Sequence, residues 1–132
     1  MPHPLVTKTL SDVPDDIAPD GSEIRLLPRP QRNDASLAHC TLPPGGVSKA
    51  VAHRTVEEIW YVLSGEGEVW RAWQTHEEVV PVRAGMSLNI PLGTQFQFRT
   101  VGSEPLTFLL TTIPPWPGPD EAVRVKDHWP VP

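Results

Sequence analysis

Two side chains, His53 and Glu58, have the types and the spacing to carry out chemistry. Glu58 lies in the strand-like run EEIWYVLSG, where Trp60 and Val62 share its face because alternate residues of a strand point the same way. An ionised carboxylate on such an apolar face needs a partner, a metal ion or a raised pKa. His53 or Arg71 is the expected partner. A carboxylate and an imidazole in one apolar pocket can act as a general acid and base.

Aromatic and basic residues near Glu58 predict the walls of its pocket. If Glu58 faces inward, either Trp70 or the pair Arg71 and Trp73 joins it from the next strand, depending on the register. Tryptophan side chains make a cavity narrow and flat-walled, so the expected ligand is a small planar or apolar molecule. Glu58, His53 and Arg71 would then set its orientation. The predicted ligand-binding residues are Trp60, Arg71, Trp73, Phe96 and Phe98.

The elements that must position these residues are predicted to be strands. Seventeen prolines and nine glycines separate short β-branched and aromatic runs, and proline breaks helices by removing a backbone donor. The run LSGEGE predicts a tight hairpin turn in which glycines adopt positive φ. This number and spacing of strands suits a sandwich or a barrel. The predicted strands cover residues 23–27, 36–42, 48–53, 58–63, 67–73, 77–82, 87–90, 95–101 and 106–113.

The chain ends carry many prolines and little hydrophobic pattern. We therefore expect a single domain over 1–132, with a core barrel at about 36–113 and extended arms at 1–22 and 114–132. Trp116 and Trp129 in the second arm are costly to leave in water, so this arm should dock on the barrel or on a second subunit. These arms, together with exposed edge strands, predict a homodimer.

Composition excludes several classes of function. The net charge of -5 and the scattered basic residues make nucleic acids and membrane surfaces poor partners. One cysteine, Cys40, cannot form an internal disulfide, and its apolar neighbours predict a buried, inert thiol. The N-terminus lacks the basic start and the long apolar run of a secretory signal, which predicts a cytoplasmic protein.

Two runs that begin with glycine resemble the paired motifs of the cupin superfamily, G(X)5HXH(X)3-4E(X)6G and G(X)5PXG(X)2H(X)3N. The first run is GVSKAVAHRTVEEIWYVLSG, residues 46–65, and the second is GMSLNIPLGTQFQFRT, residues 85–100. The resemblance implies an all-β fold, the double-stranded β-helix or jelly-roll barrel, which is often dimeric and holds its site inside the barrel mouth. In that family, three histidines and the glutamate bind one metal ion.

Only half of this ligand set is present. The motif glutamate falls on Glu58 and the second histidine on His53, whereas Val51 stands at the first histidine position. In the second run, Phe96 stands at the histidine position and Thr100 at the asparagine position. A metal site normally needs three or four protein ligands, so the resemblance leaves His53 and Glu58 as two ligands of an incomplete site.

Other residues would have to complete a metal site. If Phe96 points inward like the histidine it replaces, Phe98 shares its face and an aromatic ring lies where a ligand is expected. A bulge after the preceding turn would instead bring Gln95 or Gln97 inside, and His39 on a neighbouring strand is a further candidate ligand. The expected cofactor is therefore none, or a weakly bound divalent metal.

Three functions remain open on the sequence. The first is a cupin that binds a small molecule, with Glu58 and His53 as the candidate catalytic acid and base. The second is a metal-dependent cupin enzyme, of isomerase, cyclase or lyase type, with an atypical ligand set. The third is a structural or interaction barrel filled by Trp60, Phe96 and Phe98. Missing ligands count against the second, and the charge of Glu58 on an apolar strand counts against the third.

Overall fold

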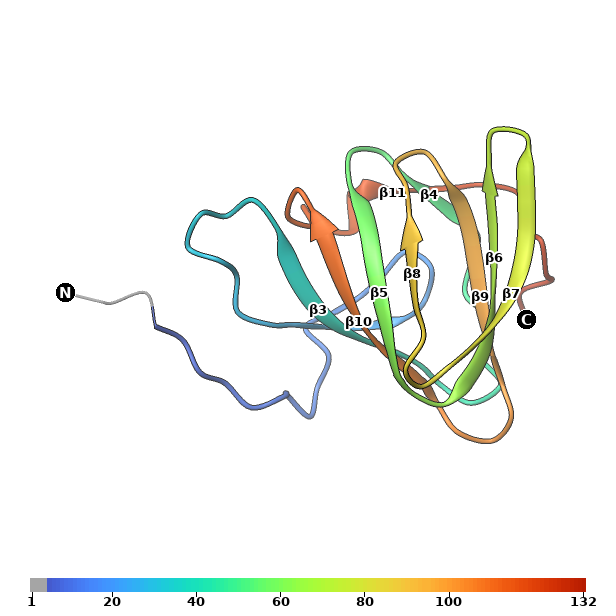
Figure 1. The fold of residues 1–132 in the computed structure, drawn as a ribbon. Coiled ribbons are helices and arrows are strands. Elements are labelled where there is room, and N and C mark those ends of the chain that lie inside the picture. The colour runs from blue at the N-terminus through green and yellow to red at the C-terminus, as the bar shows by residue number, and fades with distance from the viewer. Residues whose placement is uncertain (1–4) are drawn as a thin grey trace.

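The structure, a computed structural model, describes residues 5–132, and in this part of the chain the strands form two antiparallel sheets that face each other (Figure 1). The all-β jelly-roll prediction is thereby confirmed. No helix in these residues is long and apolar enough to cross a membrane. The first sheet contains, in spatial order, β1 (Asp16–Ile17), β2 (Glu23–Leu26), β3 (Ser36–Leu42), β10 (Leu106–Ile113), β5 (Glu57–Ser64) and β8 (Ser87–Ile90). The second contains β11 (Ala122–Arg124), β4 (Val51–His53), β9 (Gln95–Val101), β6 (Glu66–Trp73) and β7 (His76–Arg83).

The predicted hairpin turn joins β5 to β6, and two positions in it require glycine. Gly65 has φ of 81°, a conformation that L side chains rarely adopt, and a Cβ there would lie 2.2 Å from the carbonyl oxygen of Pro105. At Gly67, a Cβ would lie 2.6 Å from the carbonyl oxygen of Arg99. Close packing of neighbouring backbones around this turn therefore excludes any side chain.

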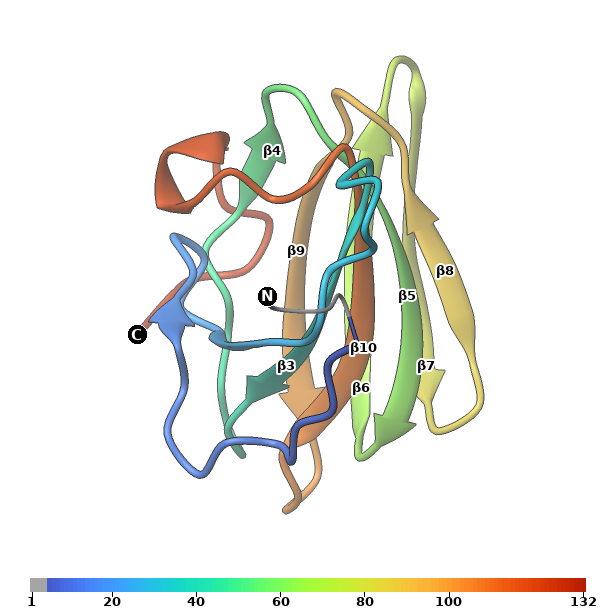
Figure 2. The ribbon, with the colours of Figure 1, turned by 90° about the vertical axis from the view of Figure 1, so that its left-hand side faces the viewer.

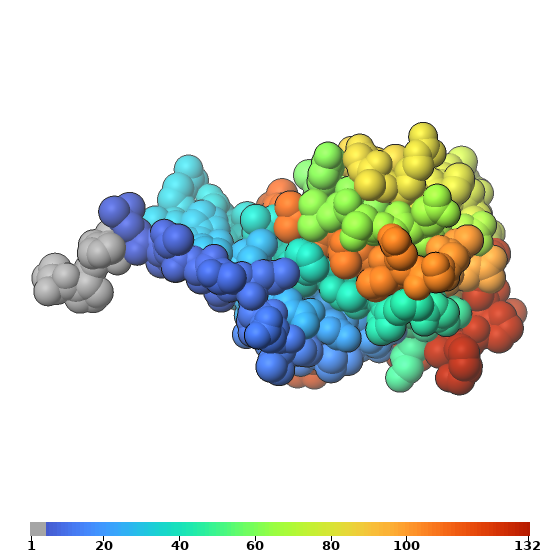
Figure 3. All heavy atoms as spheres, turned by 90° about the horizontal axis from the view of Figure 1, so that it is seen from below, coloured from blue at the N-terminus to red at the C-terminus, as the bar shows by residue number. Residues whose placement is uncertain are grey.

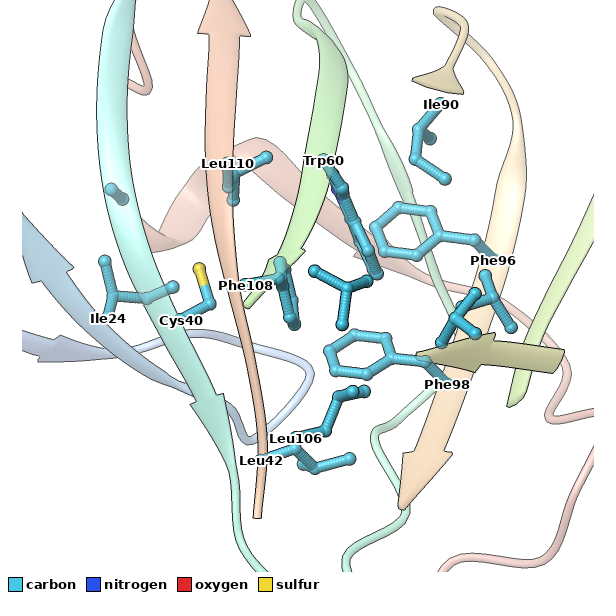
Figure 4. Packing of buried hydrophobic residues seen from close by; sticks show 14 of the residues in the cluster. Ile24, Cys40, Leu42, Trp60, Ile90, Phe96, Phe98, Leu106, Phe108 and Leu110 are labelled. Atoms are coloured by element: carbon cyan, nitrogen blue, oxygen red, sulfur yellow. The ribbon is translucent and has the colours of Figure 1, made fainter. Parts of the chain in front are cut away.

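The core between the sheets is centred on four aromatic rings (Figure 4). Trp60 stacks on Phe108 with ring centroids 4.2 Å apart, and it meets Phe98 edge-on at 5.0 Å and Phe96 edge-on at 5.9 Å. These four residues come from β5, β9 and β10, so the cluster joins both sheets. Alternate residues of β5 point to solvent, as its burial pattern shows.

The N-terminal arm, predicted to be extended, contains one short strand. Asp16–Ile17 form β1, which pairs with β2. Residues 5–14 contain no strand and run outward along the body of the molecule (Figure 3). Arg25 ties this stretch down by donating to the carbonyl oxygens of Ser11 at 2.7 Å and Asp12 at 3.0 Å. The first four residues of the predicted arm lie outside the described residues.

The C-terminal arm folds back onto the five-stranded sheet (Figure 2). It contains a 3-10 helix, η1 (Pro119–Glu121), and the strand β11, which pairs with β4. Further along, the backbone carbonyl oxygen of Trp129 accepts a hydrogen bond from the side-chain amide of Gln97 at 3.0 Å. The guanidinium of Arg99 lies 4.3 Å from the centroid of the Trp129 ring. The arm thus docks on the barrel of its own chain.

Candidate functional site

A cavity of about 30 Å³ lies between the sheets, beside the aromatic cluster. Its walls are mainly apolar and include the rings of Trp60, Phe96 and Phe98. This volume accommodates about two ordered waters or a ligand of a few heavy atoms. The polar residues that line the cavity are Asp20, Ser22, Ser36, His53, Glu58 and Thr112.

His53 and Glu58 form a hydrogen-bonded dyad at this cavity. His53 Nε2 lies 2.8 Å from Glu58 Oε2, and the two side chains are only 8% and 3% exposed. The other carboxylate oxygen, Glu58 Oε1, accepts a hydrogen bond from Trp60 Nε1 at 2.9 Å. Both oxygens of the buried carboxylate therefore have partners, which is the condition for burying such a group.

The surroundings of His53 favour its protonated form. Burial disfavours a charged imidazole and alone would lower its pKa, but the hydrogen bond and the charge of Glu58, with the charges of Glu121 and Asp20, outweigh burial and raise the pKa of His53. His53 Nδ1 is buried and has no hydrogen-bond partner among the described residues. The raised pKa favours the imidazolium form of His53 beside Glu58, and one imidazole nitrogen is left over.

Phe96 takes the place that a ligand has in the cupin motif. Its ring points into the cavity, as strand alternation predicts, and stacks on the His53 imidazole with centroids 5.6 Å apart and planes 13° apart. Val51, at the other missing histidine position, is a buried core residue. Thr100, at the asparagine position, donates from its hydroxyl to the Pro43 carbonyl oxygen at 3.0 Å. None of these three positions supplies a metal ligand.

The other candidate ligands do not line the cavity either. Gln95 is exposed, and His39 lies on the outward face of β3. Gln97 is fully buried, but on the opposite face from Phe96, where its amide oxygen accepts from the backbone of His128 at 2.8 Å. Among residues 5–132, no three His, Cys, Asp or Glu side chains are placed to hold a metal ion. The residues present do not fit the family's metal.

Arg71 and Trp73 do not line the cavity of Glu58, contrary to expectation. They lie in a separate groove of about 140 Å³ near the end of β6. The Arg71 guanidinium donates to Glu78 Oε1 at 2.7 Å and to the Asn89 carbonyl oxygen at 2.9 Å. The acceptors of the guanidinium therefore lie on β7 and β8 and do not include Glu58.

Asp20 is a cavity residue for which the sequence predicted no role. Its carboxylate accepts from the backbone N–H of Ser22 at 2.8 Å and from the Ser22 hydroxyl at 2.7 Å. Burial raises the pKa of Asp20 despite these hydrogen bonds. The run Asp-Gly-Ser was a signal for such a turn, because Asp side chains commonly bind backbone two residues on. Nothing in the sequence showed that the turn would reach the barrel.

Comparisons with known proteins agree with this fold. A family model described as a cupin domain matches residues 38–112. The uncharacterized protein MJ1618 of Methanocaldococcus jannaschii is 32% identical over 110 residues, which are 81% of this chain and 85% of that protein. The xanthan biosynthesis protein XanB of Xanthomonas campestris is 32% identical over 89 residues, 67% of this chain but 18% of XanB.

Solved structures share the fold at lower sequence identity. One Bacillus subtilis oxalate decarboxylase structure, whose Mn(II) centres were characterised, has a TM-score of 0.68 and 19% identity over 86% of this chain and 30% of that chain. The Cnp3 cupin domain of Schizosaccharomyces pombe has a TM-score of 0.62 and 13% identity over 70% of this chain and 60% of that chain. At these identities the likeness shows the fold alone. With a family model that matches more than half of its length, the chain belongs to the cupin family.

Proposed function

We propose that this cupin binds a small planar or apolar molecule in the cavity between its sheets, and that Glu58 and His53 act on it as base and acid. The observation that supports this most strongly is the hydrogen-bonded pair, 2.8 Å long, on the wall of a mainly apolar cavity. Ionisable groups with perturbed pKa values in a cavity are typical of functional sites. A barrel that served only as a scaffold would be served equally well by apolar residues there.

The chemistry that this pair supports is proton transfer within the ligand. The Glu58 carboxylate removes a proton from one atom, and the His53 imidazolium returns a proton to another. Glu58 gains one proton and His53 loses one, so the total number of protons and the net charge of the dyad stay the same. A proton transfer from Glu58 to His53 then restores the starting state. Because the cavity is largely apolar, the developing charge on the ligand would be weakly screened by water. An isomerisation by proton transfer fits these groups without a metal.

The main alternative is a non-catalytic barrel, and the small cavity volume favours it. About 30 Å³ is too small for a ring-sized ligand unless one wall moves. The movable wall would be the one formed by Asp20 and Trp116, which lie outside the central strands of both sheets. The manganese chemistry of the decarboxylase neighbour is not transferred, because its metal would lack ligands here.

Ligand binding to matched variants tests the proposal. A panel of planar acids, amides and ketones of a few heavy atoms, the size that the cavity accommodates, would be screened by thermal shift and calorimetry against the wild type and Glu58→Gln. We expect compounds that bind the wild type to lose at least about tenfold in affinity in Glu58→Gln, about 1.4 kcal/mol. The control is Glu57→Gln, the same change at the exposed neighbouring residue. Equal binding by both variants, or no wild-type binding across the panel, would contradict the proposal.

We also propose that the chain forms a homodimer. Ile59 and Tyr61 project from the outer face of β5 and are 51% and 49% exposed, which leaves apolar surface available for a partner. Sedimentation at micromolar concentration tests this, and a single 14.6 kDa species would contradict it.

A further inference from the structure

Glu121, in the C-terminal arm, lies against the turn that joins His53 to Glu58. The side chain is buried, with the residue only 3% exposed. Its carboxylate accepts hydrogen bonds from the backbone N–H groups of Thr55 and Val56, the second at 3.1 Å. The Thr55 hydroxyl lies 2.7 Å from one carboxylate oxygen and 2.9 Å from the other. One carboxylate thus holds two successive residues of the turn.

The backbone around Glu121 holds the other end of the same turn. The carbonyl oxygen of Glu121 accepts from the N–H of Arg54 at 3.1 Å, and the next residue, Ala122, is the Cα partner of His53 in the pairing of β11 with β4. Figure 2 shows this part of the arm beside β4. The arm therefore contacts the chain from His53 through Val56.

This turn matters because the two members of the dyad belong to different sheets. His53 ends β4 in the five-stranded sheet, and Glu58 lies in β5 of the six-stranded sheet. Only residues 54–56 separate the two strands along the chain, up to the start of β5 at Glu57. A hydrogen bond of 2.8 Å across the sheets depends on the conformation of this link, since hydrogen bonds weaken steeply with distance and angle.

The charge of Glu121 also acts on the dyad. Burial alone would raise the pKa of Glu121, but the hydrogen bonds from Thr55 and Val56 outweigh burial and lower it. The carboxylate is therefore ionised at neutral pH. Its negative charge is one of those that favour the imidazolium form of His53.

We propose that Glu121 is a positioning residue for the dyad, and that the C-terminal arm holds His53 and Glu58 at hydrogen-bond distance by fastening the turn between them. This inference rests on the proposed function only in treating the dyad as the reacting pair. Its physical content, the coupling between Glu121 and the geometry of the pair, is measurable in the protein without any ligand.

The test is NMR spectroscopy of the full chain at one fixed pH, for the variants Glu121→Ala and Glu121→Gln. The signals are the indole N–H of Trp60, which donates to Glu58 Oε1, and the imidazole of His53. In Glu121→Ala both signals should move, the indole proton upfield as its hydrogen bond weakens. Glu121→Gln should restore most of the wild-type indole position, because an amide oxygen still accepts from the turn.

The matched control is Asp120→Ala, which removes the same charge from the exposed neighbouring residue in η1 and should leave both signals in place. A folded Glu121→Ala with wild-type signals would overturn the inference, as would a Gln variant that shifts as far as the Ala variant. If Glu121→Ala does not fold, Thr55→Ala replaces it, since it removes the hydroxyl contacts at an exposed position and should move the same signals less. Unchanged signals there would also overturn the inference. A failed ligand screen would leave these spectra unaffected.

Discussion

The two ends of the barrel interior use the same strand alternation for opposite purposes. At one end Trp60, Phe98 and Phe108 fill the space between the sheets with close ring contacts. At the other end, His53 and Glu58 form a buried, hydrogen-bonded pair of ionisable groups beside a mainly apolar cavity. The aromatic end is stabilised by the burial of apolar surface, whereas the stability of the dyad end depends on each buried polar atom keeping its hydrogen-bond partner. Substitutions at the two ends should therefore destabilise the protein for different physical reasons.

The largest loss of stability is expected at the aromatic end. Phe108 is 1% exposed and stacks on Trp60, so Phe108→Ala leaves a cavity that the neighbouring rings cannot fill. We expect the free energy of unfolding to fall by about 3–5 kcal/mol in chemical denaturation. Leu92→Ala, at a position that is 49% exposed, is the control and should change it by about 0.5 kcal/mol. A similar loss for both variants would contradict the description of the core.

At the dyad end, the expected effect is smaller and non-additive. His53→Leu leaves the Glu58 carboxylate buried with only the Trp60 N–H as partner, and should cost about 1–3 kcal/mol. Glu58→Leu should cost a similar amount, because it leaves the imidazole unpaired. The double variant should lose clearly less than the sum, since it removes both charges together. Additive losses in a double-mutant cycle would show that the pair is not coupled.

The dyad end should also depend on pH, unlike the aromatic end. The pKa of His53 is raised above its ordinary value of 6.5, so the native protein holds this proton more tightly than the unfolded chain. The resulting stabilisation is fully present below 6.5 and is lost as the pH rises through the raised pKa. It amounts to about 1.4 kcal/mol for each unit of that rise. Denaturation at about pH 6 and about pH 9 measures it.

His53→Leu is the control for the pH experiment, because it should remove this part of the pH dependence while the other titrating groups remain. A wild type that gains stability over the same range, relative to this variant, would contradict the raised pKa.

Contacts on the outer surface should matter least and give a baseline for both ends. Arg99 lies over the Trp129 ring and pairs with Glu68 at 2.6 Å, with both members of that ion pair about one-third exposed. Arg99→Ala should cost about 0.5–1 kcal/mol, because water and salt screen such contacts. The exposed Arg83 provides a control, and Arg83→Ala should have a smaller effect in the same denaturation experiment. A loss comparable to that of Phe108→Ala would mean that the arm, and not the core, dominates stability.

Most of the fold could be predicted from the sequence. The predicted strands at 36–42, 87–90, 95–101 and 106–113 coincide with the observed ones, because alternating burial and the flanking glycines and prolines define them locally. The strands β1 and β11 were missed. They are two and three residues long and form only because they pair with the edge of a neighbouring strand. The local sequence pattern therefore does not predict them.

The candidate site could be predicted in part. Strand alternation and the motif spacing place Glu58 and Phe96 on one inner surface with His53. Arg71 has the strand alternation that the prediction requires. In the register of β6 with β7, however, it lies opposite Glu78 and binds that residue instead of Glu58. The sequence did not predict the contact of Glu121 with the turn between His53 and Glu58. That contact depends on where a proline-rich arm folds back, and therefore on interactions between distant parts of the chain.

Phe96 stands where the cupin motif has a metal ligand, and we propose that His53 and Glu58 serve as a pair without a metal. The most direct test is calorimetric titration of chelator-treated protein with Mn²⁺ and Zn²⁺, in the wild type and in His53→Leu. We expect no stoichiometric binding at micromolar metal in either protein. Tight binding of one ion per chain to the wild type, lost in His53→Leu, would contradict it.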